Sequence, residues 1–88
     1  MDSKRIDDIK KLPPQEAITI LTGILEDSPD DSEALTLRGE CHWALNHRRD
    51  AINDYLASIR IKPDGRAKLL LEYANSILDF YHKDLLNP

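Results

Sequence analysis

Apolar residues recur at three- and four-residue steps along almost the whole chain, which is the spacing of one face of an α-helix. Short polar or proline-containing stretches interrupt this pattern at 28–32, 46–47 and 63–65. The pattern therefore predicts four main helices, at about 14–26, 32–45, 48–61 and 66–83. A shorter helix at about 3–12, carried by Ile6, Ile9 and Leu12, is expected before them.

Local signals define the ends and the contacts of these helices. Asp31 or Ser32 is a suitable N-cap for the helix at 32–45. Asn46 follows that helix, and Asn is second only to Gly in adopting the left-handed conformation that a tight helical hairpin needs. Gly39 lies inside the same helix, where Gly costs about 1 kcal/mol relative to Ala. We therefore expect a neighbouring helix to pass close to Gly39, with Ala51 facing it.

The chain also contains an internal repeat. Residues 14–30 align with residues 48–64 at an offset of 34, and the pairs at key positions are Ala17 with Ala51, Ile18 with Ile52, Leu21 with Tyr55, Pro29 with Pro63 and Asp30 with Asp64. An offset of this size is typical of stacked helical hairpins. It predicts that the helices at 14–26 and 48–61 are equivalent second helices of two successive hairpins.

The segment 32–63 resembles a tetratricopeptide repeat, whose pattern is W-x2-L-G-x2-Y, then A-x3-F, then P. Gly39, Ala51, Tyr55 and Pro63 have the family's spacing, whereas Leu35, Arg38 and His42 replace its Trp, Leu and Tyr. The resemblance implies an all-α fold in which antiparallel helical hairpins stack as a short right-handed solenoid. Residues 1–29 would form a partial repeat, residues 32–63 a full repeat, and residues 66–83 a C-terminal capping helix that covers Tyr55 and Ile59.

Each repeat buries its apolar face only against its neighbours, so the apolar faces at the two ends of the stack need a cover. Three explanations are possible for one full repeat between two partial ones. The flanking helices cap the stack, the chain is a fragment of a longer solenoid, or a second copy of the chain covers the exposed end. The aromatic residues Tyr73, Phe80 and Tyr81 suit either a cap or a homodimer contact.

Composition and charge narrow the classes of partner. The net charge of −4 over 88 residues argues against nucleic acid, which needs a dense basic face. Cys41 is the only cysteine, so no internal disulfide can form, and a reducing compartment fits best. The charged first residues lack the apolar segment of a signal peptide, and no stretch approaches the roughly 20 apolar residues of a membrane span. We therefore expect a cytoplasmic chain without a membrane partner.

Candidate reactive groups do not form a recognisable catalytic pattern. Cys41 and His42 point about 100° apart on one helix, and His47 lies beyond its end, so neither pair has metal-ligand spacing. The three glycines are isolated, which excludes a glycine-rich phosphate loop, and no paired carboxylates stand out. The sequence thus predicts no enzyme, no cofactor and no metal site.

The family resemblance further implies a protein or peptide partner in the concave groove that the first helix of each hairpin lines. The residues predicted to face this groove are Glu33, Thr36, Leu37, Glu40 and Trp43 on one helix and Lys68, Leu71, Asn75 and Leu78 on the last. Because Glu33 and Glu40 are acidic, a peptide with a basic residue beside an apolar one suits the groove better than an acidic C-terminus. The leading hypothesis is an interaction scaffold, and the alternative is a self-associating helical unit or a fragment of a longer solenoid.

Overall fold

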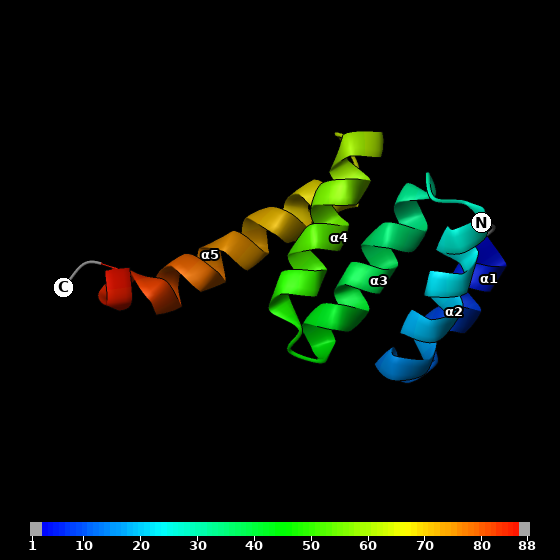
Figure 1. Ribbon diagram of the computed structural model, residues 1–88, viewed down its shortest axis with the longest axis horizontal. Helices are drawn as coiled ribbons and strands as arrows, with labels where there is room; N and C mark the ends of the chain where they lie inside the picture. The colour runs from blue at the N-terminus through cyan, green and yellow to red at the C-terminus, as the bar shows by residue number, and fades with distance from the viewer. Residues whose placement is uncertain (1–2, 87–88) are drawn as a thin grey trace.

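The computed structural model describes residues 3–86, and the side chains of residues 4–77. The described residues form five α-helices and no strand: α1 (Ser3–Lys10), α2 (Pro14–Asp27), α3 (Ser32–Ala44), α4 (Arg48–Ile61) and α5 (Arg66–Leu86). Figure 1 shows α2, α3 and α4 as neighbours that run alternately up and down, with α1 against α2, while α5 diverges from α4 to one side. The all-α prediction is confirmed, and the packing is consistent with a short helical repeat.

Most helix ends agree with the sequence because particular residues fix them. The Asp31 carboxylate accepts a hydrogen bond from the Ala34 backbone N–H at 3.0 Å, which makes Asp31 the N-cap of α3. Asn46 has a φ of 65°, so it takes the left-handed conformation expected at the turn between α3 and α4. The first helix ends at Lys10 rather than Leu12, since a residue followed by proline is disfavoured in the helical region and two prolines follow.

The buried side chains form two clusters. The larger joins α1, α2 and α3, and its members are Ile6, Ile9, Ala17, Leu21, Leu25, Ala34, Leu35 and Leu37. The smaller joins α4 and α5 through Ala51, Tyr55 and Ala67, with Trp43, Ile59, Leu70 and Leu71 packed around them. As expected, α5 covers Tyr55 and Ile59. Phe80 and Tyr81, which the sequence assigned to a cap or a dimer contact, lie outside the described side chains.

At Gly39, α3 leaves no room for a side chain beside α4. A Cβ atom on Gly39 would lie 2.6 and 2.8 Å from two ring carbons of Tyr55 and 3.2 Å from the Ala51 carbonyl oxygen. The expected close approach is therefore confirmed, but its main occupant is the Tyr55 ring, with Ala51 contributing only a backbone atom. The 34-residue offset is also consistent with the packing, because Ala17 on α2 and Ala51 on α4 are both fully buried.

A charged pair inside the helical layer connects α2, α3 and α4. The Arg38 guanidinium donates from Nε and Nη2 to the two carboxylate oxygens of Asp54, each at 2.8 Å, and from Nη1 to Thr22 Oγ1 at 3.3 Å. The bond to Asp54 raises the pKa of Arg38, and partial burial opposes this effect. Two parallel hydrogen bonds of this kind set the relative position of two helices as well as neutralising the buried carboxylate.

Candidate partner-binding groove

Two hollows lie between α3 and α5, with α4 contributing to both, and together they are called the groove. The polar hollow lies at the start of α3 and is lined by Ser32, Glu33, Thr36, Ser58, Lys62, Gly65 and Arg66. The aromatic hollow lies one to two turns further along α3 and is lined by Glu40, Trp43, Tyr55, Leu70 and Tyr73. Both hollows thus draw on the same three helices, so the groove forms only when α5 is packed on α4.

An ion pair crosses the groove between the two hollows. Arg66 Nη2 on α5 lies 2.6 Å from Glu40 Oε1 on α3, without the alignment of a regular hydrogen bond. The pair joins the two walls of the groove. It also neutralises Glu40, which the sequence analysis had assigned to a basic residue of the ligand.

The aromatic hollow combines a fixed floor with an open rim. Tyr55 is only 2 % exposed, and burial together with the nearby Glu40 raises the pKa of its hydroxyl to about 12. Tyr73, in contrast, is 61 % exposed and stands at the rim. The Arg48 guanidinium lies 4.5 Å from the centre of the Trp43 ring, a cation–π contact that holds the indole against the end of α3. The hollow has a volume of about 140 Å³, enough for one apolar side chain.

Four of the five groove residues predicted on α3 line the hollows. Glu33 and Thr36 line the polar hollow, and Glu40 and Trp43 line the aromatic one. The hydroxyl of Thr36 is already engaged, since it lies 2.7 Å from Ser58 Oγ and donates to the Ser32 carbonyl. Leu37 was assigned wrongly, because it is 4 % exposed and packs into the cluster shared with α1 and α2.

On α5 the predicted groove residues lie beside the hollows rather than in them. Lys68 and Asn75 are exposed but line neither hollow, and Leu71 packs against the cluster of Ala51, Tyr55 and Ala67. The face that α5 turns inward is centred on Ala67 and Ala74, both 1 % exposed. Because successive helix residues are 100° apart, the residues that reach the hollows are Arg66, Leu70 and Tyr73. The side chain of Leu78 lies outside the described residues.

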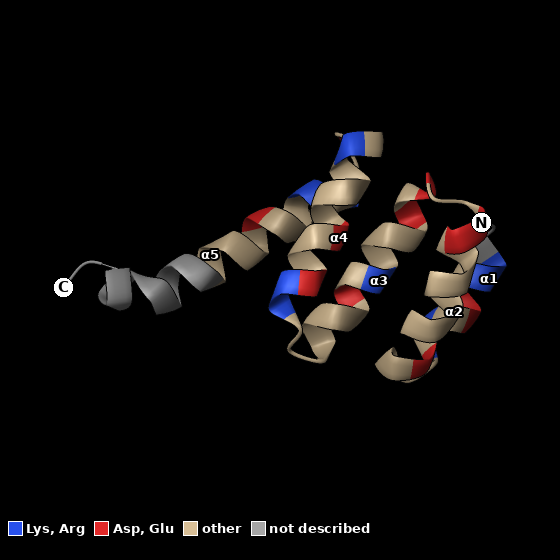
Figure 2. Cartoon of the chain, in the orientation of Figure 1, with Lys and Arg blue, Asp and Glu red and all other residues tan. Residues whose placement is uncertain are grey.

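Charge is interspersed along the groove and elsewhere. Figure 2 shows basic and acidic residues on α1, α3, α4 and the described part of α5, whereas the charged residues of α2 are all acidic. None of the described helices has the length and apolar character needed to cross a membrane. Cys41 is half-buried beside the larger cluster, and this burial, with a smaller effect from Glu40, raises the pKa of its thiol. A thiol in such a setting is a weak nucleophile at neutral pH.

The chain is similar to part of a known protein. A stretch of 71 residues is 32 % identical to Protein SGT1 homolog from Bos taurus, covering 81 % of this chain and 20 % of that protein. The chain thus spans about one fifth of the length of this curated relative. No protein-family model matches the sequence, and no solved structure matches it.

Proposed function

We propose that the chain is a non-enzymatic protein-interaction module that binds an extended segment of another protein in the groove between α3 and α5. The observation that carries the proposal is the aromatic hollow, where Trp43, Tyr55, Leu70 and Tyr73 surround an open apolar space. Aromatic side chains gathered around a pocket are the usual anchors of protein interfaces, since they offer large contact area at little conformational cost. The similarity to part of Protein SGT1 homolog supports an interaction role at a coarse level.

The proposed ligand inserts an apolar or aromatic side chain into the aromatic hollow. A basic side chain is a poorer candidate, because Arg66 already neutralises Glu40. The adjoining polar hollow presents Lys62 and Glu33, and therefore suits neutral polar groups or the backbone of the ligand. We therefore expect the ligand to carry an apolar or aromatic residue next to a polar, uncharged stretch.

Panning a library of random 12-residue peptides against the chain tests this proposal. Selected peptides should share an apolar or aromatic residue, and Tyr73→Ala should weaken their binding at least tenfold by removing one wall of the hollow. Leu69→Ala is the matched control, since Leu69 is on the same helix and 67 % exposed but lies outside both hollows. Recovery of no binding peptide, or equal losses in the two variants, would refute the groove assignment.

The competing function is self-association through the exposed side of α5. Leu69 and Tyr73 are large and exposed, and such residues mark contacts when they lie together. Sedimentation equilibrium separates the two functions. A monomer at micromolar concentration removes the dimer, whereas a dimer that Leu69→Lys dissociates would favour self-association over peptide binding.

A further inference from the structure

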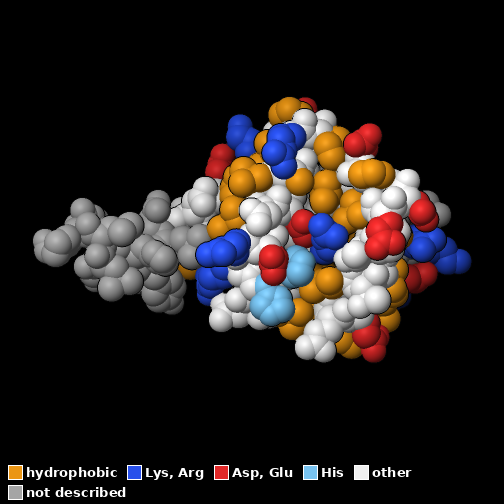
Figure 3. All heavy atoms as spheres, in the orientation of Figure 1, with side chains coloured by type: hydrophobic (Ala, Val, Ile, Leu, Met, Phe, Trp, Pro, Cys, Tyr) orange, Lys and Arg blue, Asp and Glu red, His pale blue; other side chains and the backbone are white. Residues whose placement is uncertain are grey.

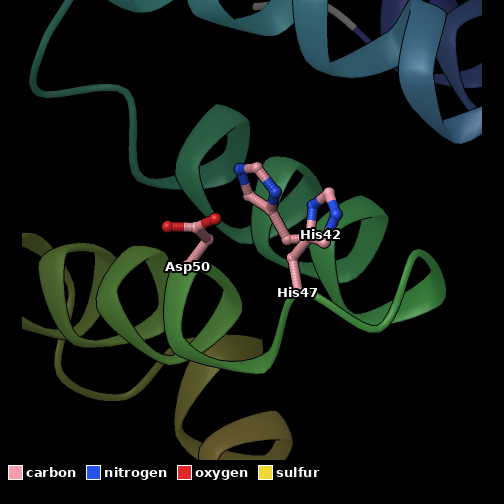
Figure 4. A group of neighbouring side chains, drawn as sticks. All are labelled: His42, His47 and Asp50. Atoms are coloured by element: carbon pink, nitrogen blue, oxygen red, sulfur yellow. The ribbon is translucent and has the colours of Figure 1, made fainter.

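Two histidines and an aspartate gather at the turn between α3 and α4. His42 is in the last turn of α3, His47 precedes α4, and Asp50 is in the first turn of α4. One potential ligand atom from each lies within 4.8 Å of the others. Figure 4 shows the Asp50 carboxylate beside the two imidazoles, with one oxygen on their side, and Figure 3 shows the described histidine side chains together at the surface.

The backbone of the turn holds this cluster in place. Asn46 is in the left-handed conformation. It therefore reverses the chain two residues after the end of α3, the helix that carries His42. The His47 backbone N–H donates to the His42 carbonyl at 2.8 Å, and the Asn46 N–H donates to the Trp43 carbonyl at 3.0 Å. The two imidazole centres are consequently 5.8 Å apart. The histidines are therefore adjacent because of the fold, although their sequence spacing is not that of a metal motif.

The two nitrogens of His42 have different surroundings. Nδ1 is buried and has no hydrogen-bond partner, while Nε2 lies 3.8 Å from Asp54 Oδ2. A buried polar atom without a partner is costly, and a bound ion would satisfy it. Histidines that coordinate metals typically direct their other ring nitrogen at a carboxylate, which fixes the tautomer and the orientation of the ring. In His42 the nitrogen on the Asp54 side is 3.8 Å from the carboxylate, longer than a hydrogen bond, so Asp54 would orient the ring only if the two groups moved closer together.

Two arginines of α3 and α4, Arg38 and Arg48, are engaged with other groups. Arg38 is held by both oxygens of Asp54. Arg48 lies over the Trp43 ring and donates from Nε to Asn46 Oδ1 at 3.0 Å. Both guanidinium groups are thus held by other side chains, although the charge of Asp50 still acts on Arg38.

We propose that His42, His47 and Asp50 form a binding site for a divalent transition metal of the zinc class. Two imidazole nitrogens favour Zn²⁺ over Mg²⁺ or Ca²⁺, which prefer all-oxygen sites, and three protein ligands leave a fourth position for water or a partner's side chain. Zinc–ligand distances are about 2.0–2.2 Å, so the donors must approach one another more closely than 4.8 Å. His47 and Asp50 are exposed and have the rotamer freedom to do so.

Calorimetric titration of ZnCl₂ into the untagged chain tests the site. The parent for this experiment carries His82→Ala, so that His42 and His47 are its only imidazoles. We expect one Zn²⁺ per chain in the presence of excess Mg²⁺. His47→Ala and Asp50→Asn should each weaken binding at least tenfold, as removal of a ligand does. The matched control is Asp64→Asn, because Asp64 is an exposed carboxylate near the opposite end of α4.

Folding and spectroscopy complete the test. His47 and Asp50 are exposed, so their variants should retain the helical circular dichroism of the parent. At a fixed concentration, Zn²⁺ should raise the melting temperature of the parent more than that of Asp50→Asn, because a ligand that binds only the native state stabilises it according to its affinity. The absence of Zn²⁺ binding, unchanged affinity in His47→Ala, half-stoichiometric binding by a dimer, or a thiolate-to-metal band with Co²⁺ that implicates Cys41 would each overturn the proposal.

Discussion

Replacement of Gly39 by alanine should destabilise the protein, although alanine is the better helix former. In a helix interior the exchange of Gly for Ala contributes about 1 kcal/mol to stability. At this site, however, the new methyl group would lie 2.6 and 2.8 Å from the Tyr55 ring. Extra atoms in a packed core typically cost about 1–3 kcal/mol. Because Tyr55 is 2 % exposed and the Ala51 carbonyl oxygen is also close, we expect the steric cost to prevail, with a net loss of up to about 2 kcal/mol.

Gly23→Ala is the matched control for this prediction. Gly23 is also inside a helix, α2, but a Cβ atom there would meet nothing within 4 Å. The substitution should therefore stabilise the protein by about 0.5–1 kcal/mol. Urea unfolding followed by circular dichroism would give both free energies of unfolding. In thermal unfolding each kcal/mol corresponds to a shift of about 4–8 °C for a domain of this size.

A second variant identifies the Tyr55 ring as the cause. In a Tyr55→Leu background the ring is gone, so Gly39→Ala should cost less than in the parent, and the double-mutant cycle should give a coupling of at least about 0.5 kcal/mol. Two results would contradict this reasoning: a Gly39→Ala variant as stable as Gly23→Ala, or the same cost of Gly39→Ala in both backgrounds. Either would mean that the close approach of α3 and α4 does not require a glycine at position 39.

Three further predictions concern polar groups. Arg38→Leu should destabilise the chain by about 3 kcal/mol, since it leaves the buried Asp54 carboxylate unpaired, and Arg38→Leu with Asp54→Leu should recover most of this loss in urea unfolding. The raised pKa of Tyr55 predicts that this residue adds no pH dependence to stability below about pH 10, where its hydroxyl is neutral in both the folded and the unfolded chain. Between pH 10 and pH 12 the Tyr55 hydroxyl ionises in the unfolded chain but not in the folded one, so the free energy of unfolding should fall by about 2 kcal/mol. The fall should be smaller in Tyr55→Phe when unfolding is measured across this range. Asn46→Ala should cost about 1 kcal/mol in thermal unfolding because of the positive φ, whereas Asn46→Gly should be tolerated.

The helix boundaries could be predicted because they depend on neighbouring residues in the sequence. Asp31 caps α3 with its own side chain, Asn46 reverses the chain in the left-handed conformation, and Pro14 lies in the first turn of α2. Each effect acts within four residues and needs no tertiary partner. The close approach at Gly39 was also predictable, since an unfavourable glycine inside a helix indicates a steric requirement.

The orientation of α5 could not be predicted in the same way. Leu69, Leu70 and Leu71 are consecutive, so the apolar residues span most of the helix circumference and fit several inward faces. The structure selects the face on which Ala67 and Ala74 allow close packing, and this leaves Leu69 67 % exposed. The candidate groove residues on this helix were misplaced for that reason.

The polar clusters were missed because they depend on the register between helices. Arg38 and Asp54 are 16 residues apart, and only the α3–α4 packing brings them together. One signal was present in the sequence, since Arg38 occupies an apolar position of the repeat pattern and a buried Arg requires a partner. His42, His47 and Asp50 carried no such signal, because a turn residue with positive φ separates them.

The turn and the groove are physically connected through Arg48. Its guanidinium contacts Asn46 on one side and the face of Trp43 on the other, so a change in the turn alters the surroundings of the indole. Trp43 is the only tryptophan, and its fluorescence would respond both to a ligand in the aromatic hollow and to a metal at the turn. Tyr73 separates the two causes, because it lines the hollow and is on α5, away from the turn. Tyr73→Ala should move the fluorescence response to a peptide to at least tenfold higher peptide concentration and leave the response to Zn²⁺ unchanged.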